Sequence, residues 1–399
     1  MDLLVSGIPF INKDIIENSI PFLNKLIVKF NPKIDDLLCE RLSMQDSINE
    51  GKTKLDFLPE TKDIREGHWG IDPIPNYFSK RTVEITGPAD RKMMINALNS
   101  KCNCFMVDLE DSMSPTWENV CQAQVNLYDA SRRNMEYMDP VKNKKYVFNK
   151  EKHPIMMVRP RGIHLPEINV LLNNYPVFGC LFDFGVFVYN NGAELIKNGN
   201  GINFYLPKLQ NYQEAELWNQ IFDYTEKELG FPEGSIKCTV LIEHIQAAFQ
   251  MEEILYVLRK HIVAMNTGRW DYIFSIIKTF QKYQNCIFPD RNQITMDTHC
   301  MESYVNLLVQ TCHKRGAMAI GGMAAQLPVK NNAELNQKNM DKVYLDKKKE
   351  VEQGVDGTWI AHPLLLEIVL YAFKKINQKG GGGILQLKIY LHFQRGQLH

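Results

Sequence analysis

Short apolar segments alternate with amphipathic segments along most of the chain. Each apolar segment has four or five residues and ends in polar or glycine-rich residues. The eight segments are Cys104–Asp108, Ile155–Val158, Gly179–Phe182, Ile202–Leu206, Thr239–Ile242, His261–Met265, Ala317–Ile320 and Thr358–Ala361. Most intervals between them carry apolar residues at helical spacing, for example Glu214–Glu228, Met301–Lys314 and Asn336–Glu352. Eight strands that alternate with helices predict an α/β fold, a TIM-type (β/α)8 barrel.

A doubly wound open sheet is the alternative fold, because it also alternates strands with helices. Such sheets commonly bind a dinucleotide through a G-x-G-x-x-G turn after the first strand. The first predicted strand is followed by LEDSMSP and has no such turn. The barrel is therefore the preferred interpretation.

Residues 1–76 carry a helical pattern without the alternation seen later. Apolar residues recur at helical spacing over Lys13–Ile34, and we expect Pro32 to end this helix. Ile34–Asn49 predicts a second helix. The turn-rich segment GHWGIDPIPNY then separates these helices from the strand pattern. We therefore expect an N-terminal helical appendage on the barrel.

The barrel is expected to occupy residues 77–376, with a divergent tail at 377–399. Leu364–Ile376 predicts a helix after the last strand. Lys379 and four glycines follow, a composition typical of a flexible joint. The remaining residues are too few for a domain of their own.

The charge balance and the cysteine pattern exclude several classes of protein. Lys+Arg and Asp+Glu both number 46, so no net charge favours nucleic acid or an anionic membrane surface. No apolar run reaches membrane-spanning length, and the N-terminus has an acid at Asp2 and no basic stretch of a signal peptide. The nine cysteines are scattered without a C-x-x-C pair, which indicates reduced packing residues in a reducing compartment.

Polar residues follow seven of the eight predicted strands. They are Asp108, Glu110 and Asp111 after the first, Arg159 and Arg161 after the second, Asp183, Lys208, Glu243 and Asp271 after the next four, and His362 after the last. The C-terminal ends of barrel strands form the rim at which the active sites of such barrels lie. The sequence therefore predicts an active site at this rim.

The segment from Cys238 to Phe274 predicts a cation site within that rim. Two strands flank a helix predicted over Ala247–Arg259, and each strand leads to a carboxylate, Glu243 or Asp271. A strand–helix–strand unit places its strands in parallel, so both acids should open onto one face. Two carboxylates there favour a hard cation such as Mg²⁺. The alternative from these residues alone is that a buried acid pairs with Arg269 or His244.

Several long motifs occur in order along the chain. They are RTVEITGPADRKMMINALNS (81–100), FMVDLEDSMSPTWENV (105–120), VRPRGIHLPE (158–167), LIEHIQAAFQMEEIL (241–255), NTGRWDYIFSIIK (266–278), THCMESYVNLLVQTCHKRGAMAIGGMAA (298–325) and DGTWIAHP (356–363). Together they resemble the malate synthase family in its shorter, A-type form, and the resemblance covers about residues 15–376. Ala264-Met265-Asn266 stands where the family usually has Gly-Leu-Asn, and Ile163 replaces a more common Trp or Leu.

The resemblance implies a reaction of the glyoxylate cycle, the condensation of acetyl-CoA with glyoxylate to malate and free CoA, with Mg²⁺ as cofactor. It implies that Glu243 and Asp271 hold the metal and that Arg159 stabilises negative charge on the substrates. It further assigns the glyoxylate carboxylate to the backbone at Gly268, Arg269, Trp270 and Asp271, the acetyl-CoA path to Pro363, and the orientation of Arg159 and metal-bound water to Asp108, Glu110 and Asp111. From the residues alone, Arg159 could instead be a structural partner of Asp108 or Glu110. Arg161 is expected to be structural.

A catalytic base is the part of the family pattern that we do not find. Family members supply it as an Asp of a Met-Glu-Asp segment in a helical domain after the barrel. The resemblance ends near Ile376, so we expect a truncated C-terminus without this domain; Met251-Glu252-Glu253 is similar but is predicted on a helix that points away from the rim. Loss of a general base typically lowers the rate about 10²–10⁴-fold. We therefore expect binding of Mg²⁺ and glyoxylate with slow turnover.

Two other functions fit parts of the sequence. One is a different Mg²⁺-dependent lyase acting on CoA thioesters, although the EITGP and GRWDYIF segments do not resemble that class. The other is a degenerate copy without catalysis. A cytoplasmic or peroxisomal location is expected, although the sequence ends in Gln397-Leu398-His399 rather than a Ser-Lys-Leu-type signal.

Overall fold

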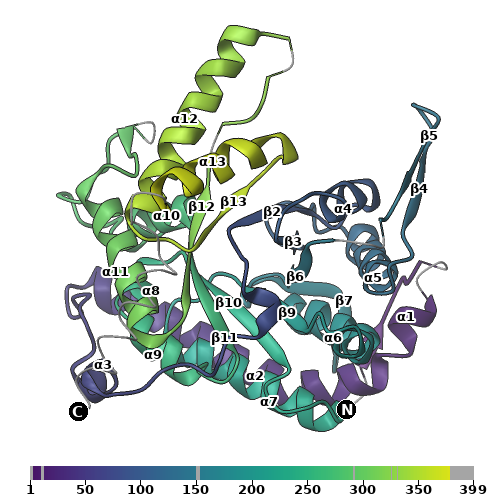
Figure 1. Cartoon of the computed structure of the whole chain (residues 1–399). Coiled ribbons are helices and arrows are strands. Elements are labelled where there is room, and N and C mark those ends of the chain that lie inside the picture. The colour runs from purple at the N-terminus through teal and green to yellow at the C-terminus, as the bar shows by residue number, and fades with distance from the viewer. Residues whose placement is uncertain are drawn as a thin grey trace, which may run out of the picture.

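Eight parallel strands form the centre of the molecule and close into a barrel (Figure 1). The structure is a computed structural model that describes residues 3–9, 13–149, 153–290, 293–324, 326–329 and 331–377. The barrel strands follow one another in sequence order: β2 (Val83–Pro88), β3 (Cys104–Asp108), β6 (Ile155–Arg159), β9 (Ile202–Leu206), β10 (Ile236–Ile242), β11 (Ile262–Thr267), β12 (Met318–Met323) and β13 (Gly357–Ile360). The predicted (β/α)8 barrel is confirmed.

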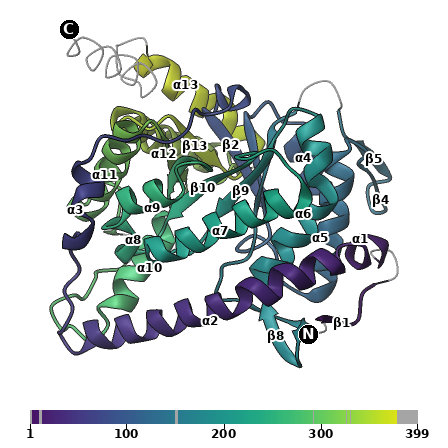
Figure 2. The same cartoon turned by 90° about the horizontal axis from the view of Figure 1, so that it is seen from below.

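Helices connect successive strands and cover the outside of the barrel (Figure 2). They are α4 (Arg91–Leu98), α5 (Trp117–Ser131), α6 (Gly179–Lys197), α7 (Tyr212–Leu229), α8 (Ile245–Ala248), α9 (Met251–Val257), α10 (Arg269–Thr279), α11 (His299–Arg315) and α12 (Ala333–Glu352), followed after β13 by η5 (Pro363–Leu365) and α13 (Leu366–Asn377). The single helix predicted over Ala247–Arg259 is thus divided into α8 and α9. None of the helices in the described ranges combines the length and the apolar composition of a membrane span.

Smaller elements decorate the barrel. The chain begins with β1 (Leu3–Val5), α1 (Lys13–Glu17), α2 (Ile20–Asn49), η2 (Pro59–Thr61), α3 (Lys62–Glu66) and η3 (Asn76–Phe78). β1 joins β7 (Pro166–Leu172) and β8 (Tyr175–Phe178) in a small antiparallel sheet, and β4 (Glu136–Asp139) pairs with β5 (Lys144–Val147) in a projecting hairpin (Figure 1). The predicted tail lies outside the described residues from position 378 onward.

One of the eight predicted strands is wrong. Gly179–Phe182 forms the first turn of α6, and the strand missing from the prediction is β2. α6 packs against α5 and α2 and is buried nearly all round, with Phe184 and Phe187 in its core-facing turns. Such a helix has a continuous apolar sequence that periodicity does not distinguish from a buried strand. Asp183 consequently lies on a helix and not at a strand end.

Pro32 does not end the first long helix, contrary to the prediction. α2 continues through it to Asn49 and runs beside α6 and α7 along the outside of the barrel (Figure 2). Phe30 and Ile34, on either side of Pro32, are both fully buried. A proline inside a helix costs about 3 kcal/mol, whereas burial of each large apolar side chain contributes about 1.5–3 kcal/mol. Packing of the apolar face therefore outweighs the proline.

The N-terminal end of the barrel is filled by a buried polar network. Arg81 pairs with Glu84 and donates to Tyr205 Oη at 2.9 Å, while Tyr205 Oη donates to Glu84 Oε2 at 2.5 Å. Trp359 Nε1 donates to the same phenol at 3.1 Å, and the buried ring of Phe78 packs below. This end of the interior is packed, so the polar side chains available to a ligand gather at the opposite rim.

Leu23→Ala should destabilise the protein because α2 shares the core of the barrel. Leu23 is fully buried, and a Cβ built on Gly185 of α6 would lie 2.5 Å from Leu23 Cδ2. We expect a loss of about 2–5 kcal/mol in the free energy of unfolding, measured by urea denaturation. Leu42→Ala is the control on the same helix: Leu42 is 69% exposed, so its loss should stay within about 0.5 kcal/mol. Equal effects of the two substitutions would contradict the shared core.

Candidate active site

The C-terminal ends of five neighbouring strands bring the predicted polar residues together. β3 ends at Asp108, and the loop after it carries Glu110 and Asp111; β6 ends at Arg159; Lys208 follows β9; Glu243 follows β10; and Asp271 lies in the first turn of α10, after β11. Because these strands are adjacent and parallel, their ends share one rim.

Asp108 and Arg159 form a buried two-point pair at this rim. Arg159 Nε donates to Asp108 Oδ1 at 2.7 Å, and Nη2 donates to Oδ2 at 2.5 Å. Asp108 also accepts from the backbone N–H groups of Glu110 (2.9 Å) and Ser112 (2.8 Å), so it fixes the loop after β3. Burial alone would raise the pKa of Asp108, but Arg159 and these donors outweigh burial and lower it. The structural pairing considered for Arg159 is thus present.

The remaining edge of the Arg159 guanidinium faces the acidic centre of the rim. Nη1 lies 3.2 Å from Asp111 Oδ2 and 3.7 Å from Glu110 Oε2. Arg159 therefore pairs with Asp108 on one side and presents positive charge to the rim on the other. A structural pairing with Asp108 and a role toward a substrate are therefore compatible for Arg159, since the two-point pair holds the guanidinium in a fixed orientation.

Lys208 lies at the centre of the acidic rim. Its Nζ is 3.2 Å from Glu110 Oε2, 3.0 Å from Asp111 Oδ2, and 3.4 Å from both Glu243 Oε1 and Asp271 Oδ1. Burial favours the neutral amine, but the carboxylates outweigh this effect and raise the pKa of Lys208, so it remains charged. One ammonium thus touches four carboxylates contributed by three separate segments of the rim.

The backbone of Lys208 is held in an uncommon conformation. Its φ of 59° lies in the left-handed region, which a side chain disfavours. Its N–H donates to Glu243 Oε1 at 2.6 Å, and its carbonyl accepts from Arg41 Nη2 at 2.8 Å. Arg41 belongs to α2 and is itself fixed by the buried Glu214, through contacts of 2.6 and 2.8 Å. The N-terminal helix therefore helps to hold the rim.

Glu243 is the acid with the strongest signs of a missing partner. Burial, together with the nearby charges of Asp271 and Glu110, raises the pKa of Glu243 to about 8 despite the opposing effect of Lys208. Its Oε2 is buried and has no hydrogen-bond partner among the described residues. A buried carboxylate oxygen without a donor is costly, so this atom points to a ligand. Burial likewise raises the pKa of Glu110 to about 7.

The turn before α10 packs directly on Glu243. A Cβ built on Gly268 would lie 2.4 Å from Glu243 Cβ, so only glycine fits there. The Gly268 N–H donates to Tyr304 Oη at 3.1 Å. α10 begins at the next residue, Arg269, and helix N-terminal turns offer N–H groups that lack an acceptor within the helix. Asp271 is in this turn, and the exposed Trp270 stands beside it.

The donor set fits a hard divalent cation. Four carboxylates converge on one point, one buried carboxylate oxygen has no donor, and an ammonium already occupies the centre. All the donors are oxygens, the ligand type that Mg²⁺ and Ca²⁺ prefer. Of the alternatives weighed for the two acids, neither Arg269 nor His244 is the partner: Arg269 faces Asp346 at 3.6 Å, and His244 caps α8.

The other predicted residues lie around this centre or outside it. Arg161 pairs with Asp183 at 2.9 Å and with Glu167 at 2.8 Å, which agrees with the structural role expected for it. Pro363 is exposed at the start of η5, where the ring of His362 accepts from the Leu364 N–H. Asp183 does not belong to the rim, because it lies in α6 with both carboxylate oxygens on Arg161.

Two residues of the rim were not predicted as site residues. Lys208 is a polar residue after a predicted strand, but its contact with four acids depends on which strands lie beside β9 in the sheet. Arg41 gave no signal, because it lies on a helix that the sequence places outside the barrel. A left-handed φ at a lysine has no signature in the sequence.

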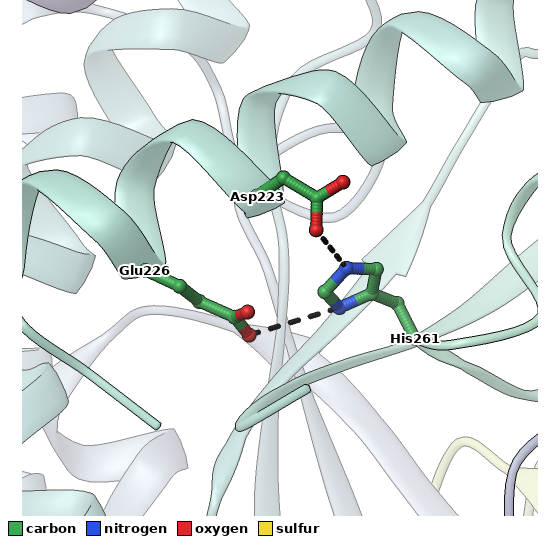
Figure 3. A group of neighbouring side chains, drawn as sticks. All are labelled: Asp223, Glu226 and His261. Atoms are coloured by element: carbon green, nitrogen blue, oxygen red, sulfur yellow. Dashed lines mark hydrogen bonds and ion pairs between the residues drawn. The ribbon is translucent and has the colours of Figure 1, made fainter. Parts of the chain in front are cut away.

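A second group of acids surrounds His261 at the opposite end of the barrel (Figure 3). His261 Nε2 lies 3.2 Å from Asp223 Oδ1, and Nδ1 lies 2.8 Å from the Ile236 carbonyl. Glu226 accepts from two backbone N–H groups at 2.8 Å each, and Lys260 pairs with Asp223. These groups already satisfy one another, so the cluster anchors the starts of β10 and β11 instead of presenting vacant ligands.

The fold and the rim define a TIM-barrel protein whose mouth carries a cluster of acids. A family model described as the TIM barrel domain of malate synthase matches residues 155–382. This chain belongs to the malate synthase family.

Curated relatives agree with this assignment. The malate synthase of Myxococcus xanthus is 50% identical over 332 residues, which are 83% of this chain and 61% of that protein. The glyoxysomal malate synthase of Brassica napus is 48% identical, over 80% of this chain and 58% of that protein. The bifunctional glyoxylate cycle protein of Caenorhabditis elegans is 49% identical, over 89% of this chain and 37% of that protein. The matched region thus spans 58–61% of the two malate synthases and 37% of the bifunctional protein.

Solved structures share the fold at low sequence identity. The malate synthase of Haloferax volcanii gives a TM-score of 0.52 at 12% identity and covers 74% of this chain and 75% of its own. A citrate lyase of Burkholderia xenovorans gives 0.51 at 13% identity, with 82% and 84% coverage. These likenesses concern the barrel fold alone.

Gly268→Ala should destabilise the protein and disturb Glu243, because the new Cβ would collide with Glu243 Cβ. We expect a loss of about 1–3 kcal/mol in the free energy of unfolding, measured by urea denaturation. Gly87→Ala is the matched control at the end of β2: its φ is not positive, and the nearest atom to its Cβ is 4.0 Å away. A Gly268 variant as stable as the Gly87 variant would contradict the close packing.

Proposed function

We propose that this chain acts as a malate synthase, condensing acetyl-CoA with glyoxylate to malate and CoA with a divalent metal, Mg²⁺, at Glu243 and Asp271. The observation that carries the proposal is that these two carboxylates both contact the Lys208 ammonium, at 3.4 Å each. They do so beside Arg159, at the rim of a barrel of this family. In this proposal residues 77–376 form the catalytic barrel, and residues 1–76 brace its rim through Arg41.

Each residue at the rim has a physical task in this proposal. Glu243 and Asp271 hold the metal, which when bound polarises the aldehyde of glyoxylate as a Lewis acid. Arg159, fixed by Asp108, presents a permanent positive charge toward the oxygen that becomes negative. Glu110 and Asp111 keep that guanidinium in place.

The first turn of α10 supplies the site for the substrate carboxylate. The positive end of a helix and its N–H groups favour an anion, and this turn adjoins Glu243 through Gly268. Because the Gly268 N–H donates to Tyr304, the residues after it in the turn, from Arg269 to Asp271, are the better candidates. The exposed Pro363, after the last strand, would lie on the acetyl-CoA path.

The glyoxysomal relative supports the peroxisomal alternative for the compartment.

The test is release of CoA thiol from acetyl-CoA by the 399-residue polypeptide, with glyoxylate and Mg²⁺. We expect release that depends on both, because the metal polarises the aldehyde that the acetyl group attacks. Arg159→Lys should lower this rate about 10²–10³-fold, because a preorganised charge is displaced. Arg132→Lys is the control, because Arg132 donates to Asn191 on the outside of the barrel, away from the rim. Thermal stabilisation by glyoxylate without any release would favour a non-catalytic copy.

Mg²⁺ affinity should rise with pH between about 6 and 8. Without metal the pKa of Glu243 is about 8, and a carboxylate must lose its proton to bind the ion. The protonated fraction falls as pH rises, so the affinity, measured by titration calorimetry, increases toward pH 8.

Glu243→Gln should remove most of this pH dependence and weaken binding by more than about 100-fold, because even outer residues of metal sites contribute about 10–100-fold. Glu228→Gln, in an exposed pair with Lys25, should change neither. An affinity that is constant or falls from pH 6 to pH 8 would contradict the assignment of Glu243 as a ligand.

A further inference from the structure

Lys208 occupies the position in which a cation would contact the carboxylates of the rim. Its Nζ lies 3.0–3.4 Å from oxygens of Glu110, Asp111, Glu243 and Asp271. Mg²⁺ binds oxygen at about 2.0–2.1 Å, so an ion held by Glu243 and Asp271 needs the space between those acids. The ammonium and the metal therefore compete for one place.

We propose that Lys208 is a built-in counter-ion that neutralises the metal-free rim and must be displaced by the divalent cation. This inference rests on the metal site proposed above. It makes Lys208 a residue that sets the affinity of the site, a role distinct from that of a ligand or a catalytic group.

The anchoring of Lys208 separates a fixed backbone from a movable side chain. The backbone is held on both sides, by its N–H to Glu243 Oε1 and by its carbonyl to Arg41, in the left-handed conformation. The side chain has no such restraint beyond its ion pairs, and it is 20% exposed. A flexible four-carbon stem allows the ammonium to leave while the loop keeps its shape.

Arg159 does not serve the same purpose. Two of its nitrogens are committed to Asp108, and its nearest contacts with the rim, to Asp111 and Glu110, are with acids other than Glu243 and Asp271. Of the two cations at the centre of the rim, only Lys208 contacts both proposed metal ligands. Displacement of Lys208 therefore leaves Arg159 in position.

The first test compares Mg²⁺ binding by the wild type, Lys208→Met and Lys260→Met in titration calorimetry. The Lys208→Met variant should bind Mg²⁺ about tenfold or more tightly than the wild type, because it lacks the competing positive charge. Metal-free Lys208→Met should melt below the wild type, because the acids lose their counter-ion, and saturating Mg²⁺ should restore most of the difference. Lys260, paired with Asp223 and Glu233 at the opposite end, is the matched control and should leave the affinity unchanged.

The second test uses the wild-type protein, so it remains valid if Lys208→Met does not fold. Lysine acylation with an N-hydroxysuccinimide ester, read by mass spectrometry, reports how accessible each amine is. Mg²⁺ should increase labelling of Lys208 several-fold, since the displaced ammonium loses its ion pairs, and labelling of Lys260 should not change.

The outcomes distinguish this inference from the proposed function. A folded Lys208→Met variant that binds Mg²⁺ no more tightly than the wild type would overturn the counter-ion role, while the metal site itself would stand. Lys208 labelling that Mg²⁺ leaves unchanged or lowers would also overturn it. Absence of Mg²⁺ binding in every variant would overturn both this inference and the proposed metal site.

Discussion

Repulsion among carboxylates at the C-terminal rim is the constraint on which the rest of the structure depends. Two unit charges 4 Å apart repel by about 4 kcal/mol at the effective dielectric of a protein surface. Four acids here lie within reach of one point, so the rim requires cations among them or protons on them, and the pKa of Glu243 is raised to about 8 and that of Glu110 to about 7. Arg159 ends β6 and Lys208 follows β9, and the parallel pairing of the neighbouring strands β3, β6, β9, β10 and β11 brings both to acids that follow β3, β10 and β11. Charge balance at the rim and the order of the barrel strands are therefore linked.

The shape of the rim is enforced by contacts made away from it. Asp108 binds Arg159 and three successive residues of its own loop, so one buried carboxylate orients both the guanidinium and the acids beside it. The lysine loop is held in a disfavoured backbone conformation by Arg41, which reaches it from α2. Strain of this kind persists only where the surroundings over-determine the conformation. α2 is thus part of the scaffold of the site as well as of the core.

The sequence predicts the barrel and the acidic rim because both follow from rules that act locally. A polar residue directly after a short apolar strand falls at a barrel rim whatever the neighbouring strands are, and this places Asp108, Glu243 and Arg159 correctly. The rule fails where local pattern and burial disagree: every residue of α6 from Gly179 to Val188 is buried, so its first turn resembles a buried strand, and β2 is not recognised. The contacts of Lys208 and Arg41 depend on distances between segments far apart in the chain, which no local pattern contains. The roles predicted for the metal ligands and for Pro363 stay predictions.

The two ends of the barrel show why a cluster of acids is not in itself a binding site. At the N-terminal end, the Glu226 carboxylate accepts two backbone N–H groups, and Asp223 has His261 and Lys260 as partners. Each of these groups is already stabilised by its hydrogen bonds and ion pairs, which an incoming ion would have to replace. At the C-terminal rim, Glu243 has a backbone donor on one oxygen and no partner in the described residues on the other. The ammonium of Lys208 lies 3.4 Å from Oε1 and makes no hydrogen bond to Oε2. Since an unsatisfied buried acceptor costs free energy, this difference, and not the number of acids, distinguishes the rim from the opposite end as the better candidate for a binding site.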